Sequence, residues 1–214
     1  MPIATWTGRK ATPEAAAADI SAALGDELGL PDAPSATTLP AESTGVPAGS
    51  LLPPRERFSG MPAATHCFVY VDARTPRPFE LRASVLGGRS LIRRSLGLGL
   101  LLYAVPLTMR PLPSPVGLST TSGSTPALFE GDPAAANGLN SDAQLLETAR
   151  ALTPTTAGPD RHHSWQVARR LTIEPLPHGA VLLVQTLHRA TPRAWSLGAA
   201  RVLDFAAGVE AALG

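Results

Sequence analysis

The stretch RRSLGLGLLLYAVPLTMR, residues 93–110, decides how the rest of the chain is interpreted. Its residues 95–109 carry no charge, and arginines stand at both ends. As a helix these residues would be about 22 Å long, which is short of the roughly 30 Å hydrocarbon core of a bilayer. Pro106 would interrupt such a helix further. We therefore expect folded protein, rather than a membrane, to shelter this stretch.

Two local structures stay open for the stretch. Its leucines alternate with Gly97 and Gly99, and this period of two favours a β-strand with one bare face. The leucine, tyrosine and alanine content equally suits a short buried helix that starts near Arg89. In both cases the simplest expectation is a core segment, and a surface that binds a partner is the alternative.

Length and composition are those of a chain that can build its own core. A core of about 150 residues buries roughly 68–70% of the surface that the unfolded chain exposes, and the 214 residues here exceed that length. The charged fraction of 16% lies below the typical value of about 25%. Lys10 is the single lysine among 18 basic residues, an arginine bias typical of a GC-rich genome.

The cysteine content and the first residues favour a cytoplasmic protein. Cys67 is the only cysteine, so the chain has no internal disulfide. The first twenty residues lack a positive segment followed by an apolar run, which a secretory signal would need.

Charge is unevenly distributed along the chain. Residues 1–60 sum to −3, whereas residues 74–110 hold seven arginines against Glu80 alone and sum to +6. This excess surrounds the apolar stretch, so an anionic partner is the expectation that follows from it. Nucleic acid is not indicated, because no recognised module is present and the two aromatic residues of the region suit a core.

The first third predicts a helix followed by a linker. Thr12 suits an N-cap, Pro13 suits the first helical position, and Gly25 or Gly29 suits the end. Residues 30–62 are interrupted by prolines and read as a linker or an extended arm. We therefore predict an N-terminal helical segment at 1–29, a Pro/Ala/Ser-rich linker or arm at 30–62, and an α+β domain at 63–214.

The middle of the chain predicts two strands and loops. HCFVYVDA is rich in β-formers, and FELRASV alternates an apolar face with a polar face that includes Glu80. Residues 111–133 have loop composition, with a short strand expected at ALFE. Asp132 and Pro133 suit a helix start, but Gly138 and Asn140 are expected to end that helix within a turn.

The last third predicts a helix, a hairpin and a helix. Ser141 is expected to cap DAQLLETARAL, and Ser196 to cap the final helix LGAARVLDFAAGVEAAL. Between them, a strand ending at LTIEPL turns at LPHG into the nearly continuous apolar run AVLLVQTLH, which is typical of a buried strand. The whole order predicts an α+β fold with a mainly antiparallel sheet and helices packed on one face.

Motifs that would carry chemistry are weak. His66 and Cys67 are adjacent in a strand and would point to opposite faces. His162 and His163 match no metal-ligand spacing, and no GxSxG, GxxxxGK[ST] or HExxH motif occurs. The sequence therefore indicates no catalytic residue, metal ligand or cofactor, and Glu130 and Asp132 are expected to serve turn formation and capping.

The sequence thus predicts a non-enzymatic protein-interaction module. Its expected surface combines apolar side chains with an arginine rim: Arg89, Arg93, Arg94, Leu96, Leu98, Leu100, Tyr103 and Arg110. The expected partner is an acidic protein or a second copy of the chain. The alternatives are a peripheral membrane protein that binds anionic lipid through residues 89–110, and an enzyme with a site near His162 and His163.

Overall fold

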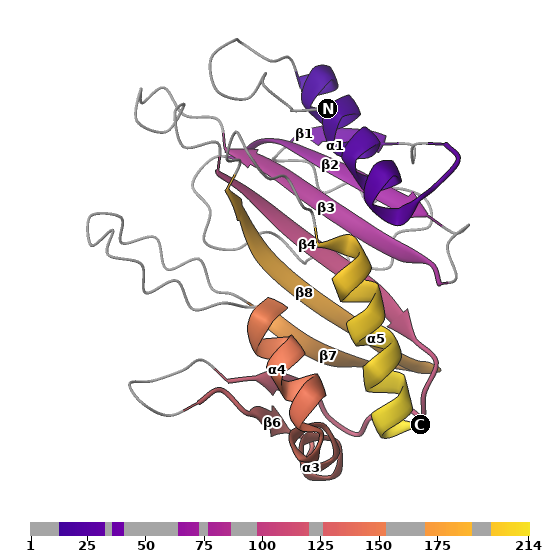
Figure 1. The fold of residues 1–214 in the computed structure, drawn as a ribbon, viewed down its shortest axis with the longest axis vertical. Helices are drawn as coiled ribbons and strands as arrows, with labels where there is room; N and C mark the ends of the chain where they lie inside the picture. The colour runs from indigo at the N-terminus through magenta and orange to yellow at the C-terminus, as the bar shows by residue number, and fades with distance from the viewer. Residues whose placement is uncertain are drawn as a thin grey trace, which may run out of the picture. The chain divides into compact units, whose positions relative to one another are not determined.

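The computed structural model describes residues 13–32, 36–40, 64–72, 77–86, 98–119, 126–152, 170–189 and 198–214. Figure 1 shows the helices and strands of these residues. The chain divides into two compact units. Unit 1 comprises residues 1–104 and 187–200, and unit 2 comprises residues 105–186 and 201–214.

The described residues confirm the predicted α+β class. Every strand pair whose register is described is antiparallel. Unit 1 holds α1 (Pro13–Leu28), β1 (Ala36–Pro40), β2 (Ala64–Asp72), β3 (Phe79–Leu86) and most of β4 (Leu98–Leu107). Unit 2 holds β5 (Val116–Leu118), β6 (Phe129–Gly131), α3 (Pro133–Ser141), α4 (Ala143–Leu152), β7 (Arg170–Leu176), and most of β8 (Gly179–Arg189) and α5 (Ala199–Leu213).

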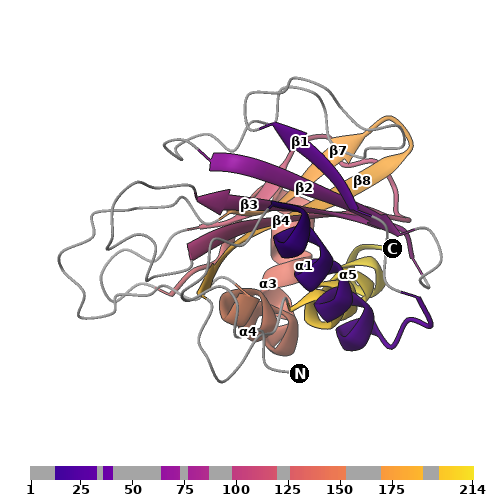
Figure 2. The same cartoon turned by 90° about the horizontal axis from the view of Figure 1, so that it is seen from above.

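In unit 1 the predicted first helix begins at Pro13 and ends before Gly29, as expected. Gly29 adopts φ +63°, and the N–H groups of Gly29 and Leu30 donate to the carbonyls of Asp26 and Gly25. This is the Schellman pattern, in which a left-handed glycine lets the last carbonyls of the helix find donors. α1 packs on β1 and β2 through its buried face, which includes Leu24 (Figure 2).

The strands of unit 1 follow the order β1-β2-β3-β4. Residues 36–40, inside the segment expected to be a linker or extended arm, form β1 and pair with β2 from Ala36↔Tyr70 to Pro40↔His66. Thr37 and Thr38 suit a strand because they are β-branched. The domain boundaries proposed from the sequence are not tested by this pairing and stay a prediction.

From Leu98 to Leu107 the apolar stretch forms a strand rather than a helix. β4 pairs with β3 from Glu80↔Ala104 to Val85↔Gly99. The predicted alternation in β3 is wrong near its start, because Phe79, Glu80 and Leu81 are all completely buried. Since successive side chains of a strand point to opposite faces, both faces of β3 are covered there.

In unit 2 the predicted C-terminal hairpin is confirmed. β7 and β8 pair in register from Arg170↔Gln185 to Leu176↔Gly179, so Pro177 and His178 alone form the loop. Leu171 and Ile173 are buried. Residues 180–184 of β8 are all buried, as the continuous apolar run predicted.

Residues 116–118 correct the expectation of a loop, because they form β5 between β6 and β7. The tight turn into the next helix depends on Gly131, which has φ +123° and pairs with Val116. A Cβ atom at Gly131 would lie 2.1 Å from the carbonyl oxygen of Pro115. The same carbonyl accepts the N–H of Asp132 at 3.3 Å.

Helix α3 begins where expected but runs further than predicted. Asp132 caps it by accepting the N–H of Ala135 at 2.9 Å, and Pro133 follows the cap. The helix continues through Gly138 and Asn140 because tertiary contacts outweigh their weak helix propensity. Space at Gly138 admits Leu213 of α5, whose Cδ2 would lie 3.1 Å from a Cβ added there.

The cap of α4 also differs from the prediction. Asp142, not Ser141, accepts the N–H of Leu145 through its side chain at 2.9 Å. The Ser141 hydroxyl instead donates to the Gly138 carbonyl at 2.7 Å. Asp is as good a cap as Ser and is the residue directly before the helix. Ser196, the expected cap of α5, lies outside the described residues.

In unit 2, α4 and α5 lie on one face of β7 and β8, and α3 contacts α4 and β6 (Figures 1 and 2). A Cβ atom at Gly208 of α5 would lie 2.8 Å from Cδ1 of Leu145 in α4, so the two helices approach closely at this glycine. The buried face of α5 in this unit is made by four apolar residues: Val202, Phe205, Ala206 and Val209.

The turn at Gly131 yields a test of this architecture. We expect Gly131→Ala to lower the free energy of unfolding by more than about 3 kcal/mol, because it combines a strained backbone with a clash against Pro115. Gly29→Ala is the matched control, since Gly29 also has positive φ but has no atom within 4 Å of its would-be Cβ. It should cost only about 1–2 kcal/mol. Urea denaturation measures both, and equal losses would contradict the close approach at Gly131.

Candidate interaction surface

The side chains of the apolar stretch lie in the core from Leu101 to Val105 and again at Leu107. Residues 101–105 are each at most 4% exposed, and Leu107 is equally buried. Because consecutive residues are buried, both faces of β4 are covered along this segment. This part of the stretch therefore supplies burial within the protein and not a contact surface.

The eight residues predicted to form the surface are divided by this finding. Tyr103 is 1% exposed and is a core residue, whereas Arg110 is exposed. Leu98 and Leu100 lie in β4, but their side chains are outside those the structure describes. Arg89, Arg93, Arg94 and Leu96 also lie outside the described residues, so no assembled arginine rim can be traced.

Tyr103 sits in a setting that keeps its phenol protonated. Burial raises the pKa of Tyr103 well above its usual value, and the negative charge of Glu27 in α1 raises it further. The Glu27 carboxylate also accepts the N–H of Ala200, in the first turn of α5, at 3.4 Å. A carboxylate at this place satisfies an otherwise unpaired helix donor and complements the helix dipole.

The loop that follows β4 leads the chain to the surface of unit 2. The N–H of Thr108 donates to Oε1 of Glu210 in α5 at 2.6 Å. A Cβ atom at Gly179 would lie 2.8 Å from the Leu107 carbonyl oxygen and 3.7 Å from that of Met109. These contacts hold the start of the loop between the C-terminal turns of α5 and the tip of the β7–β8 hairpin.

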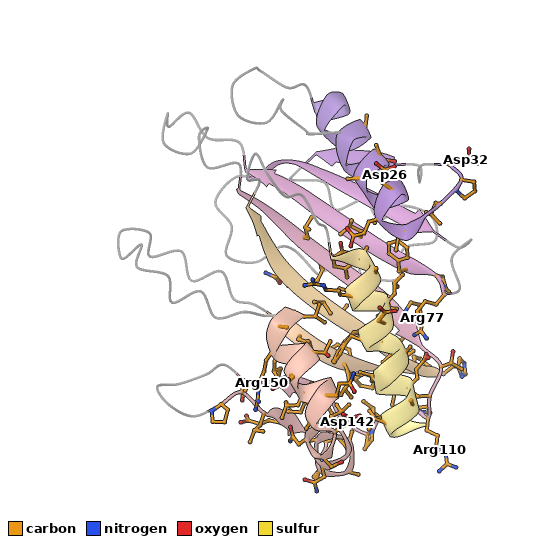
Figure 3. All side chains as sticks on the ribbon, viewed as in Figure 1. Asp26, Asp32, Arg77, Arg110, Asp142 and Arg150 are labelled. Atoms are coloured by element: carbon orange, nitrogen blue, oxygen red, sulfur yellow. The ribbon has the colours of Figure 1, made fainter. Side chains whose placement is uncertain are left out.

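Two exposed segments therefore lie together at this end of unit 2. We call them the hairpin-tip surface, defined as Met109, Arg110, Pro111, Leu176, Pro177 and His178. Leu176 is 39% exposed, Met109 is half-buried, and the other four residues are exposed. The Arg110 side chain points away from the ribbon (Figure 3). An exposed apolar side chain and an exposed cation thus lie on two segments whose backbones approach each other at Gly179.

Sequence reasoning missed Leu176, although a signal was present. Leu176 has the same strand parity as Thr172 and Glu174, which are half-buried, and opposite parity to the buried Leu171 and Ile173. An apolar residue on the outward parity of a strand, next to a turn, is the pattern that could have identified it.

The groups considered for chemistry do not assemble among the described residues. Asp132 is 6% exposed and engaged as the cap of α3, while its neighbour Glu130 is exposed. Within the described ranges, no three His, Cys, Asp or Glu side chains gather as a metal site would require. His162 and His163 lie outside these ranges, as do the side chains of His66 and Cys67.

None of the helices in the described part of the chain has both the length and the apolar character that a membrane span requires. Compared with protein-family models, curated proteins and solved structures, the chain shows no match.

The raised pKa of Tyr103 predicts how stability depends on alkaline pH. The unfolded chain releases the phenol proton near pH 10, its usual pKa, while the folded protein retains it. The contribution of Tyr103 is therefore fully present below pH 10 and is lost as the pH rises further, by up to about 1.4 kcal/mol per pH unit. Between pH 10 and 11, the free energy of unfolding of the Tyr103→Phe variant should fall less steeply with pH than that of the parent. Urea midpoints across that range measure this, and parallel curves would contradict it.

Proposed function

We propose that this chain is a non-enzymatic protein-interaction module whose hairpin-tip surface contacts an acidic protein partner. The observation that carries the proposal is that Leu176 and Arg110 are both exposed, on two segments whose backbones approach each other at Gly179. The proposed surface keeps only Met109 of the expected residues 95–109, because the described side chains from Leu101 to Leu107 are mostly buried.

Leu176 has the properties of an apolar anchor. It is the last residue of β7 and pairs with Gly179 across a two-residue loop. Pro177 has its φ fixed by its ring, so little conformational freedom remains to be lost when a partner binds. Binding energy at interfaces concentrates in a few such preorganised residues.

Arg110 supplies the charge for partner selection. It is the last of the seven arginines in residues 74–110, the segment of largest charge excess in the chain. A cation at the rim of an apolar contact steers an acidic partner during approach and disfavours basic ones. Its guanidinium also forms two parallel hydrogen bonds with a carboxylate, which fixes orientation.

A peptide selection tests this function. The full-length chain is used to select from a random peptide library displayed on phage. We expect the selected peptides to combine Asp or Glu with at least one apolar residue. Their affinity should fall at least about tenfold for Leu176→Glu and for Arg110→Glu, since each change removes one half of the contact. Raising the salt concentration should weaken binding to the parent, because screening removes the steering term.

Leu128→Glu is the matched control, because Leu128 is 40% exposed in the same unit but does not belong to the hairpin-tip surface. It should leave peptide affinity unchanged. Selected peptides without acidic enrichment, or equal affinity for all three variants, would contradict the proposal. Binding of the parent to vesicles of anionic lipid that Leu176→Glu abolishes would favour the membrane alternative instead.

A further inference from the structure

Side chains bond to backbone groups of residues 127 and 129 at the outer edge of the unit 2 sheet. Strand order in this unit is β8-β7-β5-β6, so β6 has a strand on one side and none beyond it among the described residues of the unit. Such an edge presents backbone N–H and C=O groups to any strand that approaches, and native proteins protect it.

The direction in which each backbone group of β6 points follows from its partners. The Leu128 carbonyl accepts the N–H of Ser119 at 2.8 Å, and the Leu128 N–H donates to the Ser119 hydroxyl at 3.0 Å. The Asp132 N–H donates to the Pro115 carbonyl. Because antiparallel strands bond at alternate residues, the N–H and C=O of Phe129 point away from β5.

Asn140 of α3 occupies the place of a strand partner at Phe129. Its Oδ1 accepts the Phe129 N–H at 2.9 Å, and its Nδ2 donates to the Phe129 carbonyl at 2.9 Å. One carboxamide thus supplies the donor and the acceptor that the backbone of an adjacent strand would supply. This pair of hydrogen bonds also explains why α3 continues through an asparagine.

Arg150 of α4 covers the next outward group. Its Nε and Nη2 both donate to the Ala127 carbonyl, at 3.0 and 2.9 Å. Ala127 and Phe129 are two residues apart and share the outward parity, so two helices contribute one side chain each to the same edge. Arg150 is labelled in Figure 3, where it extends from α4.

We propose that Asn140 and Arg150 form an edge cap that keeps β6 from pairing with β6 of a second copy of this chain. Two identical antiparallel strands are self-complementary, because each Phe129 offers the donor that the other accepts. Leu128, 40% exposed next to this edge, adds apolar area that such a pairing would bury. The occupant that the cap excludes is therefore the chain itself.

Removing the cap tests the proposal. In the full chain, Asn140→Ala combined with Arg150→Ala should produce a species of twice the parent mass by size exclusion with light scattering, in a concentration-dependent way. Hydrogen exchange adds a local readout. At low concentration the Phe129 amide should exchange about tenfold faster than in the parent, and at high concentration its protection should return as the second copy supplies a new acceptor. Adding Leu128→Glu should restore the monomer, because like charges would then meet across the pairing.

Ser141→Ala and Thr148→Ala are the controls, because these hydroxyls donate only within their own helices, to Gly138 and Gln144. Both should keep the parent mass and the parent exchange rate at Phe129. A double variant that stays monomeric, with Phe129 exchanging fast at every concentration, would overturn the proposal. If the double variant does not fold, Asn140→Ala and Arg150→Ala are measured singly, and a parent mass at high concentration in both has the same meaning.

Discussion

The need to cover both faces of strand segments that are buried on both sides is the constraint on which this structure depends. Residues 101–105 of β4 and 180–184 of β8 are all buried, and so are three consecutive residues at the start of β3. Each aliphatic side chain buried in this way contributes about 1.5–3 kcal/mol relative to an exposed one. Polypeptide must therefore lie against both faces of these strands. In unit 2 the amphipathic helices α4 and α5 lie against one face of the sheet. In unit 1 the helix α1 lies against β1 and β2.

Completeness of backbone hydrogen bonding is the second constraint, and it explains the irregular parts. β5 and β6 have only three residues each, and Pro115 has no N–H to give to a ladder. Its carbonyl is still used, because Gly131 allows the chain to approach closely enough for Asp132 to donate to it. The Asp132 side chain then accepts the N–H of Ala135 at the start of α3. Further along α3, Asn140 lies on the side of Phe129 that faces away from β5 and bonds to its backbone. Donors and acceptors that a longer sheet would pair through strands are paired here through side chains.

The features that the sequence predicted well are those that short-range patterns determine. The start of α1 at Pro13, its end at Gly29, and the β7–β8 hairpin follow from capping, glycine preference and apolar periodicity. Gly138 and Asn140 predicted a break in α3 because their helix propensities are poor. The helix continues because Leu213 packs at Gly138 and the Asn140 side chain forms hydrogen bonds with the backbone of Phe129. Glu80 followed an alternating pattern and is nevertheless buried, because both faces of β3 are covered there. The exposed residues of the candidate surface come from two segments more than sixty residues apart, and only the fold brings them together.

The two exposed regions of unit 2 differ in a way that bears on how a partner would be recognised. At the β6 edge the carbonyl of Ala127 and both backbone groups of Phe129 already have partners on α4 and α3, so a strand could pair with these groups only by displacing the arginine and amide side chains. At the hairpin tip the turn leaves Leu176, Pro177 and His178 exposed, and Arg110 is exposed on the neighbouring segment. A partner that adds a strand to a sheet edge is bound mainly through backbone hydrogen bonds, which discriminate weakly between sequences. A partner bound through a leucine and an arginine is selected by the chemistry of its side chains. Under the proposed function, the charged tip selects the partner by its side-chain chemistry, and under the proposed role of the edge cap, protection of β6 limits the competing contact with copies of the same chain.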